Sequence, residues 1–247
     1  MSIYLGNTGT SPISIYKGSQ AITAVYVGEN KVWSTTDITK VDYIETDGNC
    51  WLNIGPLLTE TSIVAGSFYQ PLGYDDTHVF WGSNGYGAFV YYSNAYRVRA
   101  ETLYENGGTR YDSNYNNAST SLPFYLIKQI FGGQSGYTAY AEQTSSPYLY
   151  SSLSHYLENN PSSRLLHVVS IEGRTFDSTQ DVFVMKGVKN ARLSSGARCF
   201  GFRMWDNGIA TFDGVPATDG TDYGLYDRVS GTFFINAGTG TMTGGNL

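Results

Sequence analysis

Charged residues are scarce in this sequence, and the positive ones are dispersed. Charged residues make up 15% of the 247 positions, against about 25% in an average soluble domain, and the formal net charge is −6. The longest basic grouping is Arg97-Val98-Arg99. Because binding a polyphosphate requires clustered positive charge, nucleic acid is not an expected partner.

The sequence also lacks the hydrophobic segments that direct a chain to a membrane or across it. No apolar run approaches the ~20 residues that span a bilayer, so we expect no membrane insertion. The stretch from Met1 to Gly6 has neither a basic n-region nor an apolar h-region, so we expect no secretory signal peptide. These absences together predict a protein that is made in the cytoplasm.

Cysteine and histidine are too few for a disulfide framework or a metal motif. Cys50 and Cys199 lie 149 positions apart, and the histidines at positions 78, 155 and 167 show no ligand spacing. We therefore expect two free thiols and no cofactor.

Calcium is the one bound cation that the sequence does not exclude, because aspartates in loops are typical Ca²⁺ ligands. Solvated turn carboxylates are the alternative interpretation of the same residues. The weak candidates are Asp75, Asp76, Asp219 and Asp222.

Glycine and tyrosine, in contrast, are abundant, with 29 and 21 residues. Many short strands joined by tight turns are typical of such a composition, and 41% hydrophobic residues can support a core. We predict an all-β, antiparallel two-sheet sandwich with strands near residues 43–46, 50–54, 62–65, 78–81, 88–92, 96–99, 166–171, 182–185 and 198–205. Residues 111–163 are rich in Tyr, Asn and Ser, and we expect long loops or an insertion there, with one helix over 148–157.

The first 33 residues contain a repeated pattern, [Ile/Val]-Tyr-x-Gly, which begins at Ile3, Ile15 and Val25. Each unit predicts a short strand closed by a turn glycine. We expect residues 1–36 to form a small N-terminal β segment and residues 37–247 to form the main domain. Three strands cannot bury a core of their own, so the segment either extends the main sheet or anchors the chain to other subunits. In the second case Tyr4, Tyr16, Tyr26 and Trp33 are the contact residues, and a homo-oligomer, preferably a trimer, is expected.

Both ends of the main domain resemble a known family. The opening stretch, residues 43–55, is similar to the first hairpin of concanavalin A-like, laminin-G-like jelly rolls in phage and bacterial surface proteins. The stretches 202–208, 224–234 and 236–240 are similar to the closing motif of the same group. This resemblance implies a jelly roll of two antiparallel sheets. The closing motif also has a purely structural explanation, since Asp206-Asn207-Gly208 is a hairpin turn signal and Asp227 can bond turn amides.

The same fold family includes glucanases, and an enzyme of this kind would carry a catalytic carboxylate pair. Retaining glycosidases need two carboxylates about 5–5.5 Å apart. The only Glu-x-Asp is Glu45-Thr46-Asp47, and the position of the next carboxylate is Asn49 or Cys50. No Gly-x-Ser-x-Gly motif occurs either. We therefore expect no enzymatic activity.

A glycan site would require exposed aromatic rings that stack on sugars, with polar side chains that bond the hydroxyls. Residues 80–97 supply such side chains, although strand alternation places part of them in the core. The candidate glycan-binding residues are Trp81, Tyr86, Tyr91, Tyr92, Tyr96 and Arg97.

The repeated Ile-Tyr-x-Gly opening resembles the N-termini of virion proteins from tailed phages of gut bacteria, where it precedes a lectin-like domain. This resemblance implies a non-enzymatic virion structural protein, a head or tail fibre or decoration protein, with other virion proteins as partners and host-surface or mucus glycans as ligands. A bacterial cell-surface carbohydrate-binding adhesin is the alternative, and a glycan hydrolase is a third, disfavoured one.

Overall fold

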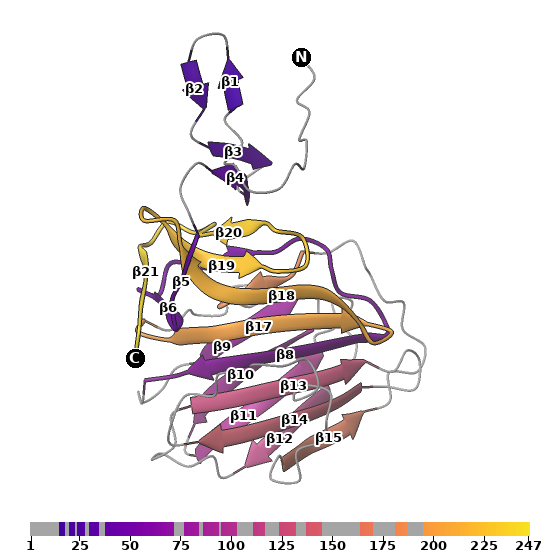
Figure 1. Ribbon diagram of the computed structural model, residues 1–247. Coiled ribbons are helices and arrows are strands. Elements are labelled where there is room, and N and C mark those ends of the chain that lie inside the picture. The colour runs from indigo at the N-terminus through magenta and orange to yellow at the C-terminus, as the bar shows by residue number, and fades with distance from the viewer. Residues whose placement is uncertain are drawn as a thin grey trace.

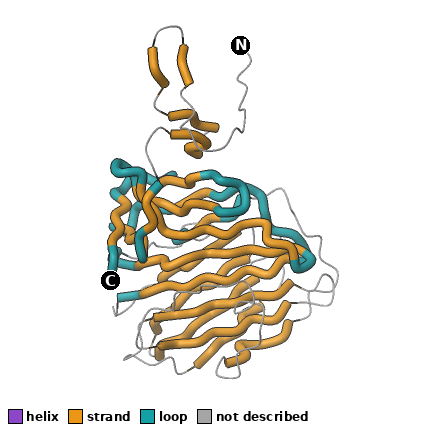
Figure 2. The backbone as a smooth tube through the Cα atoms, in the orientation of Figure 1, coloured by secondary structure: helices purple, strands orange, loops and turns teal. Residues whose placement is uncertain are grey.

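The computed structural model describes most of the sandwich. It describes residues 15–17, 20–22, 24–27, 30–34, 38–71, 77–83, 86–93, 95–102, 111–116, 124–131, 137–144, 164–169, 181–186 and 195–247, with side chains for 38–71, 79–83, 124–131, 181–186 and 195–247. Every secondary-structure element in these ranges is a β-strand (Figure 2). The strands are β1 (Ile15–Lys17), β2 (Gln20–Ile22), β3 (Ala24–Val27), β4 (Asn30–Ser34), β5 (Thr39–Lys40), β6 (Tyr43–Thr46), β7 (Leu52–Asn53), β8 (Ser62–Tyr69), β9 (Thr77–Ser83), β10 (Tyr86–Ser93), β11 (Ala95–Thr102), β12 (Tyr111–Asn116), β13 (Phe124–Phe131), β14 (Tyr137–Thr144), β15 (Arg164–Val169), β16 (Phe183–Val184), β17 (Arg198–Asp206), β18 (Ile209–Thr218), β19 (Tyr223–Asp227), β20 (Phe233–Ile235) and β21 (Met242–Gly245).

The strands form two large sheets and one small one. The larger sheet has the order β15-β14-β13-β8-β17-β18-β19-β20-β4-β3, with β5, β6 and β21 pairing alongside this path. The second sheet has the order β12-β11-β10-β9-β16-β7, and among the described strands β1 and β2 pair only with each other, in a two-stranded sheet. The two large sheets are layered on one another (Figure 1). The predicted all-β, antiparallel jelly-roll sandwich is thus confirmed.

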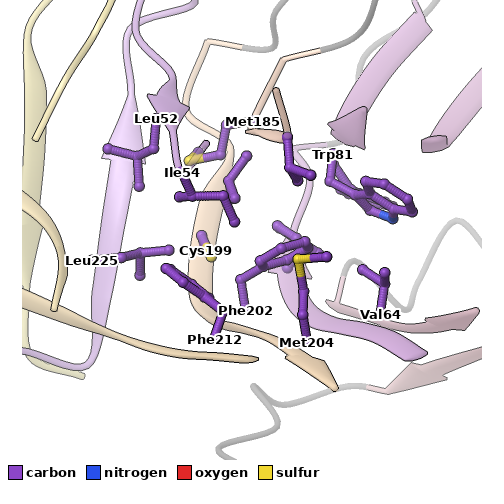
Figure 3. Packing of buried hydrophobic residues seen from close by; sticks show 14 of the residues in the cluster. Leu52, Ile54, Val64, Trp81, Met185, Cys199, Phe202, Met204, Phe212 and Leu225 are labelled. Carbon is purple, nitrogen blue, oxygen red and sulfur yellow. The ribbon is translucent and has the colours of Figure 1, made fainter. Parts of the chain in front are cut away.

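The hydrophobic core lies between the two large sheets, because strand alternation directs every second side chain inward. Phe202 and Met204 on β17 and Leu52 on β7 are all fully buried and belong to one cluster (Figure 3). The Trp81 ring on β9 lies 6.1 Å from the Phe202 ring and 6.5 Å from the Phe131 ring, centroid to centroid. Aromatic rings therefore fill much of the space between the layers, as expected for a sequence with 15% aromatic residues.

The β17–β18 hairpin forms where the Asp206-Asn207-Gly208 signal predicted it. Asn207 and Gly208 have φ angles of 48° and 78°, and a two-residue type I′ turn needs positive φ at both positions. Asp227 accepts hydrogen bonds from the amides of Val229 and Ser230 at 3.0 Å each, which confirms its role as a turn acceptor. These parts of the closing motif are explained by local backbone geometry.

The expectation of loops across residues 111–163 is wrong for much of that stretch. β12, β13 and β14 lie within it, and β13 pairs with β8 on one side and β14 on the other. Tyr125 and Ile127 of β13 are buried in the main core. The strand carries apolar side chains on both faces, so it shows no clean alternation from which it could be recognised. The helix expected over residues 148–157 lies outside the described residues.

The N-terminal segment contains four described strands rather than three. β3 and β4 pair with each other, and β4 joins the larger sheet through Lys31 opposite Phe233 of β20. The β1–β2 hairpin projects beyond the sandwich (Figure 1). The β3–β4 part of the segment thus extends the main sheet, as the first interpretation expected, whereas the anchor to other subunits stays a prediction. The first repeat unit, with Tyr4, lies outside the described residues.

Candidate functional site

Trp81 is not a sugar-stacking residue, and this part of the glycan-site prediction is wrong. Its side chain is 1% exposed and lies between the two sheets (Figure 3). The register explains the burial, because Trp81 pairs with Val184 of β16, whose side chain is also fully buried. The tryptophan occupies the inward face of its strand.

The other predicted glycan residues lie on one hairpin. Tyr86, Tyr91 and Tyr92 are on β10, and Tyr96 and Arg97 are on β11. The register places Tyr91 opposite Arg97 and Tyr92 opposite Tyr96. Their side chains lie outside the described residues, so a sugar site on this hairpin stays a prediction.

Asp219 and Asp222 form a turn between β18 and β19. Asp219 is 2% exposed, and its Oδ1 atom accepts hydrogen bonds from the amides of Thr221 at 3.0 Å and Asp222 at 2.8 Å. The Asp222 carbonyl accepts a hydrogen bond from the Thr218 hydroxyl. Within the described ranges no three His, Cys, Asp or Glu side chains gather as metal ligands. Asp75 and Asp76 lie outside those ranges.

Glu45 and Asp47 are both engaged in structural contacts. Glu45 Oε2 lies 2.5 Å from the Arg198 guanidinium. Asp47 accepts hydrogen bonds from the amides of Thr241 at 2.7 Å and Asn49 at 2.8 Å, and these bonds lower the pKa of its carboxyl. The two carboxylates thus stabilise a turn and a strand pair.

Two clusters on the described surface combine aromatic rings with a cation. The first, the Trp51–Lys186 cluster, consists of Trp51, Asn53, Asp181, Phe183 and Lys186, all of them half-buried. The Lys186 Nζ atom lies 3.9 Å from the centroid of the Trp51 ring and 4.7 Å from that of Phe183. Asn53 Nδ2 donates a 2.8 Å hydrogen bond to Asp181 Oδ2. Ring, amide, carboxylate and ammonium groups thus meet at the edge of the six-stranded sheet.

Strand pairing explains most of this arrangement. Asn53 of β7 lies opposite Phe183 of β16, and their neighbours Leu52 and Val184 point into the core. Alternation therefore puts Asn53 and Phe183 on the outer face. The pairing continues through Ile54, whose amide donates to the Val182 carbonyl.

Lys186 reaches the same face because Met185 breaks the alternation. A regular strand would direct residue 185 outward and residue 186 inward. Met185 instead has a φ angle of 65° and is buried in the core, where its side chain lies near Leu52 and Ile54 (Figure 3). The left-handed conformation thus turns the chain so that Lys186 comes to lie over the rings.

The closing motif holds Trp51 in place. The Trp51 amide donates to Asn236 Oδ1 at 3.2 Å, and the Trp51 carbonyl accepts from the Ala237 amide at 2.8 Å. A Cβ atom at Gly238 would lie 2.8 Å from the Trp51 ring and 2.2 Å from the Asn49 carbonyl oxygen, so only glycine fits there.

The second cluster, the Tyr43–Arg198 cluster, surrounds an ion pair. The Arg198 guanidinium lies 4.3 Å from the Tyr43 ring centroid and 5.5 Å from the Tyr69 ring centroid. Its charge is balanced by Glu45, at 2.5 Å. The cation of this cluster is therefore paired with an anion, whereas the Lys186 ammonium of the first cluster has no ion-pair partner among the described side chains.

Neither cluster was predicted from the sequence. The alternation in Cys50-Trp51-Leu52-Asn53-Ile54 was sufficient to place Trp51 and Asn53 on one face. Lys186 could not be placed in this way, because its position depends on the unusual φ angle of Met185.

No family model matches the sequence, and no curated protein matches it. Among solved structures, the chain is similar to the native heptameric SAP-like pentraxin from Limulus polyphemus, with a TM-score of 0.41 and 11% identity over 71% of this chain and 77% of that chain. No helix in the described ranges has the length and hydrophobicity to span a membrane.

Proposed function

We propose that the chain is a non-enzymatic structural protein of a tailed phage virion, either a fibre or a decoration protein of the head or tail. In this function the N-terminal β segment joins other virion proteins, and the lectin-like jelly roll contacts host-surface or mucus glycans. The resemblance of the Ile-Tyr-x-Gly repeat to virion proteins supports the assignment.

One structural observation carries the proposal, the separate β1–β2 sheet. Each of its strands has three residues, and the hairpin pairs with no other described strand. A hairpin of this size is not stable alone, because it buries too little surface to offset the loss of backbone entropy. β3 also ends the larger sheet without a further partner among the described strands, and open strand edges pair readily with strands of another chain. Contact with neighbouring subunits would stabilise both features.

The carboxylate contacts support the non-enzymatic part of the proposal. A retaining glycosidase needs one carboxylate free to attack and another that donates a proton. Glu45 is paired with Arg198, and Asp47 is bonded to two backbone amides.

The test is co-purification with phage particles. Tagged full-length protein and a variant lacking residues 1–36 are produced during infection, and particles are separated on a density gradient. We expect the full-length protein to band with the particles and the truncated variant, checked for folding by circular dichroism, to remain unbound. Full-length protein that fractionates with the cell envelope instead would favour the adhesin alternative.

A second assay tests the absence of catalysis. Purified protein is incubated with a broad panel of polysaccharides, and reducing ends are measured. We expect no release above the buffer control. Release that is lost in a Glu45→Gln or Asp47→Asn variant would contradict the proposal.

A further inference from the structure

We propose that the Trp51–Lys186 cluster binds an acidic glycan unit, a pyranose that carries a carboxylate. This inference rests on the glycan contact in the proposed function and names the ligand class and the site. The site is independent of the hairpin of β10 and β11 on which the sequence placed glycan binding.

The first argument is the charge of Lys186. Its ammonium contacts the Trp51 and Phe183 rings, and no described side chain forms an ion pair or hydrogen bond with it. The arginines in the described ion pairs differ, since Arg198 pairs with Glu45, and Arg203 and Arg228 both pair with Asp213. A half-buried ammonium on aromatic rings retains its hydrogen-bonding capacity for an external anion, and a carboxylate is the partner that suits it best.

The second argument is the conformation that puts Lys186 in this place. A non-glycine residue with positive φ is disfavoured, and such residues persist where the surrounding structure requires them, often at functional sites. Met185 adopts this conformation, and the Lys186 side chain therefore points outward and lies beside Phe183. A chain with ordinary φ at this position would direct the ammonium toward the core.

The third argument is the polar pair beside Phe183. Asn53 is fixed, because its amide nitrogen donates to Asp181 and its Oδ1 accepts from the Gly55 amide at 2.9 Å. Among the described contacts the Asp181 carboxylate has Asn53 as its one partner, so it can accept further hydrogen bonds. Hydroxyl groups are the donors that such a carboxylate recognises on a sugar.

The antiparallel register sets the order of these groups. Phe183 lies opposite Asn53, Asp181 precedes Phe183 by two residues, and Lys186 follows it by three. The Asn53–Asp181 pair and the Lys186 ammonium thus both lie beside Phe183. A neutral sugar would leave the ammonium without a partner, and a simple anion would leave the Asn53–Asp181 pair unused. A sugar acid uses both.

The test is isothermal titration of the full-length protein with sugar-acid oligosaccharides and their neutral counterparts. The probes are tetragalacturonate, a hyaluronan fragment and sialyllactose, each beside its methyl ester. The variants are Lys186→Gln, which removes the charge, Lys186→Arg, which keeps it, and Lys40→Gln, which removes an exposed lysine of β5 as a matched control. Circular dichroism and thermal unfolding check that each variant folds.

We expect at least one acidic probe to bind and its methyl ester to bind much more weakly. Lys186→Gln should weaken binding by about tenfold to a hundredfold, the effect of losing one charge-assisted hydrogen bond, whereas Lys186→Arg and Lys40→Gln should bind within a few-fold of the parent. Binding of a neutral glycan alone, or equal binding by Lys186→Gln, would overturn this inference and leave the proposed glycan contact standing. Absence of binding to every probe overturns the inference, while particle co-purification still decides the virion role.

Discussion

At the residue scale, aspartates in the described turns act as acceptors for backbone amides. Asp47, Asp219 and Asp227 each accept at least two such hydrogen bonds. Each carboxylate thus satisfies backbone donors that the turn would otherwise leave unpaired. The acidic side chains that the sequence offers for catalysis or calcium thus include several with structural functions.

Asp47 should make folding stability depend on pH. Its lowered pKa means that the ionised carboxyl stabilises the folded state fully above the ordinary pKa of about 3.9, and that this contribution is lost as the pH falls through the folded-state value. We expect Asp47→Asn to lower the urea midpoint at pH 7 and the difference from the parent to shrink below about pH 4. Glu60→Gln, at an exposed site, is the control. An Asp47→Asn difference that is constant over this range would contradict the assignment.

The two thiols should be unreactive in the folded protein. Burial raises the pKa of Cys199 to about 12 and also raises the pKa of Cys50, so neither forms much thiolate at pH 8. We expect negligible reaction with Ellman's reagent in buffer and two equivalents after unfolding in urea. Rapid labelling of one thiol in the native protein would contradict this expectation and show that the structure around that thiol opens to solvent.

At the scale of elements, the strands that sequence patterns predicted best are those with clear alternation or strong turn residues. β6, β17 and the β17–β18 turn were predicted with nearly correct bounds. β13 was missed because both of its faces are partly buried, with Tyr125 in the core and Leu126 against a second small cluster. In the candidate site, the outer face of β7 was readable from alternation, whereas Lys186 depends on a backbone angle that no local pattern specifies.

The close pairing of β19 and β20 depends on Gly224. A Cβ atom there would lie 1.9 Å from the Phe234 carbonyl oxygen, and backbone cannot move aside as a flexible side chain can. We expect Gly224→Ala to destabilise the fold by about 1–3 kcal/mol in urea denaturation, as overpacking in a core does. Thr243→Ala, at an exposed position of β21, should change stability by less than about 0.5 kcal/mol. Equal stability of the two variants would mean that β19 and β20 can move apart with little loss of free energy of unfolding.

At the scale of the whole molecule, the jelly roll closes on itself without the N-terminal segment. β21 pairs with β6 along four residues, from Met242 opposite Thr46 to Gly245 opposite Tyr43. The Asp42 amide donates to the Gly245 carbonyl, and the Leu247 amide donates to the Asp42 carboxylate. In contrast, β4 joins β20 through a single residue pair. The body of the protein should therefore be one folding unit to which the N-terminal strands are weakly attached.

Deletion of residues 1–36 should separate assembly from folding. We expect the remaining chain to be a soluble monomer whose thermal midpoint is close to that of the full-length protein, because the deletion removes one residue pair from β20 and leaves the β5–β18 and β6–β21 pairs intact. The full-length protein should sediment as an oligomer, with a trimer as the preferred state, because the β1–β2 hairpin and the outer edge of β3 have no further partner among the described strands. Sedimentation velocity and differential scanning calorimetry of both proteins measure the two quantities. If the full-length protein is a monomer with the same thermal midpoint as the truncated chain, the segment supports neither assembly nor stability. If truncation lowers the thermal midpoint strongly, β3 and β4 belong to the folding unit of the sandwich.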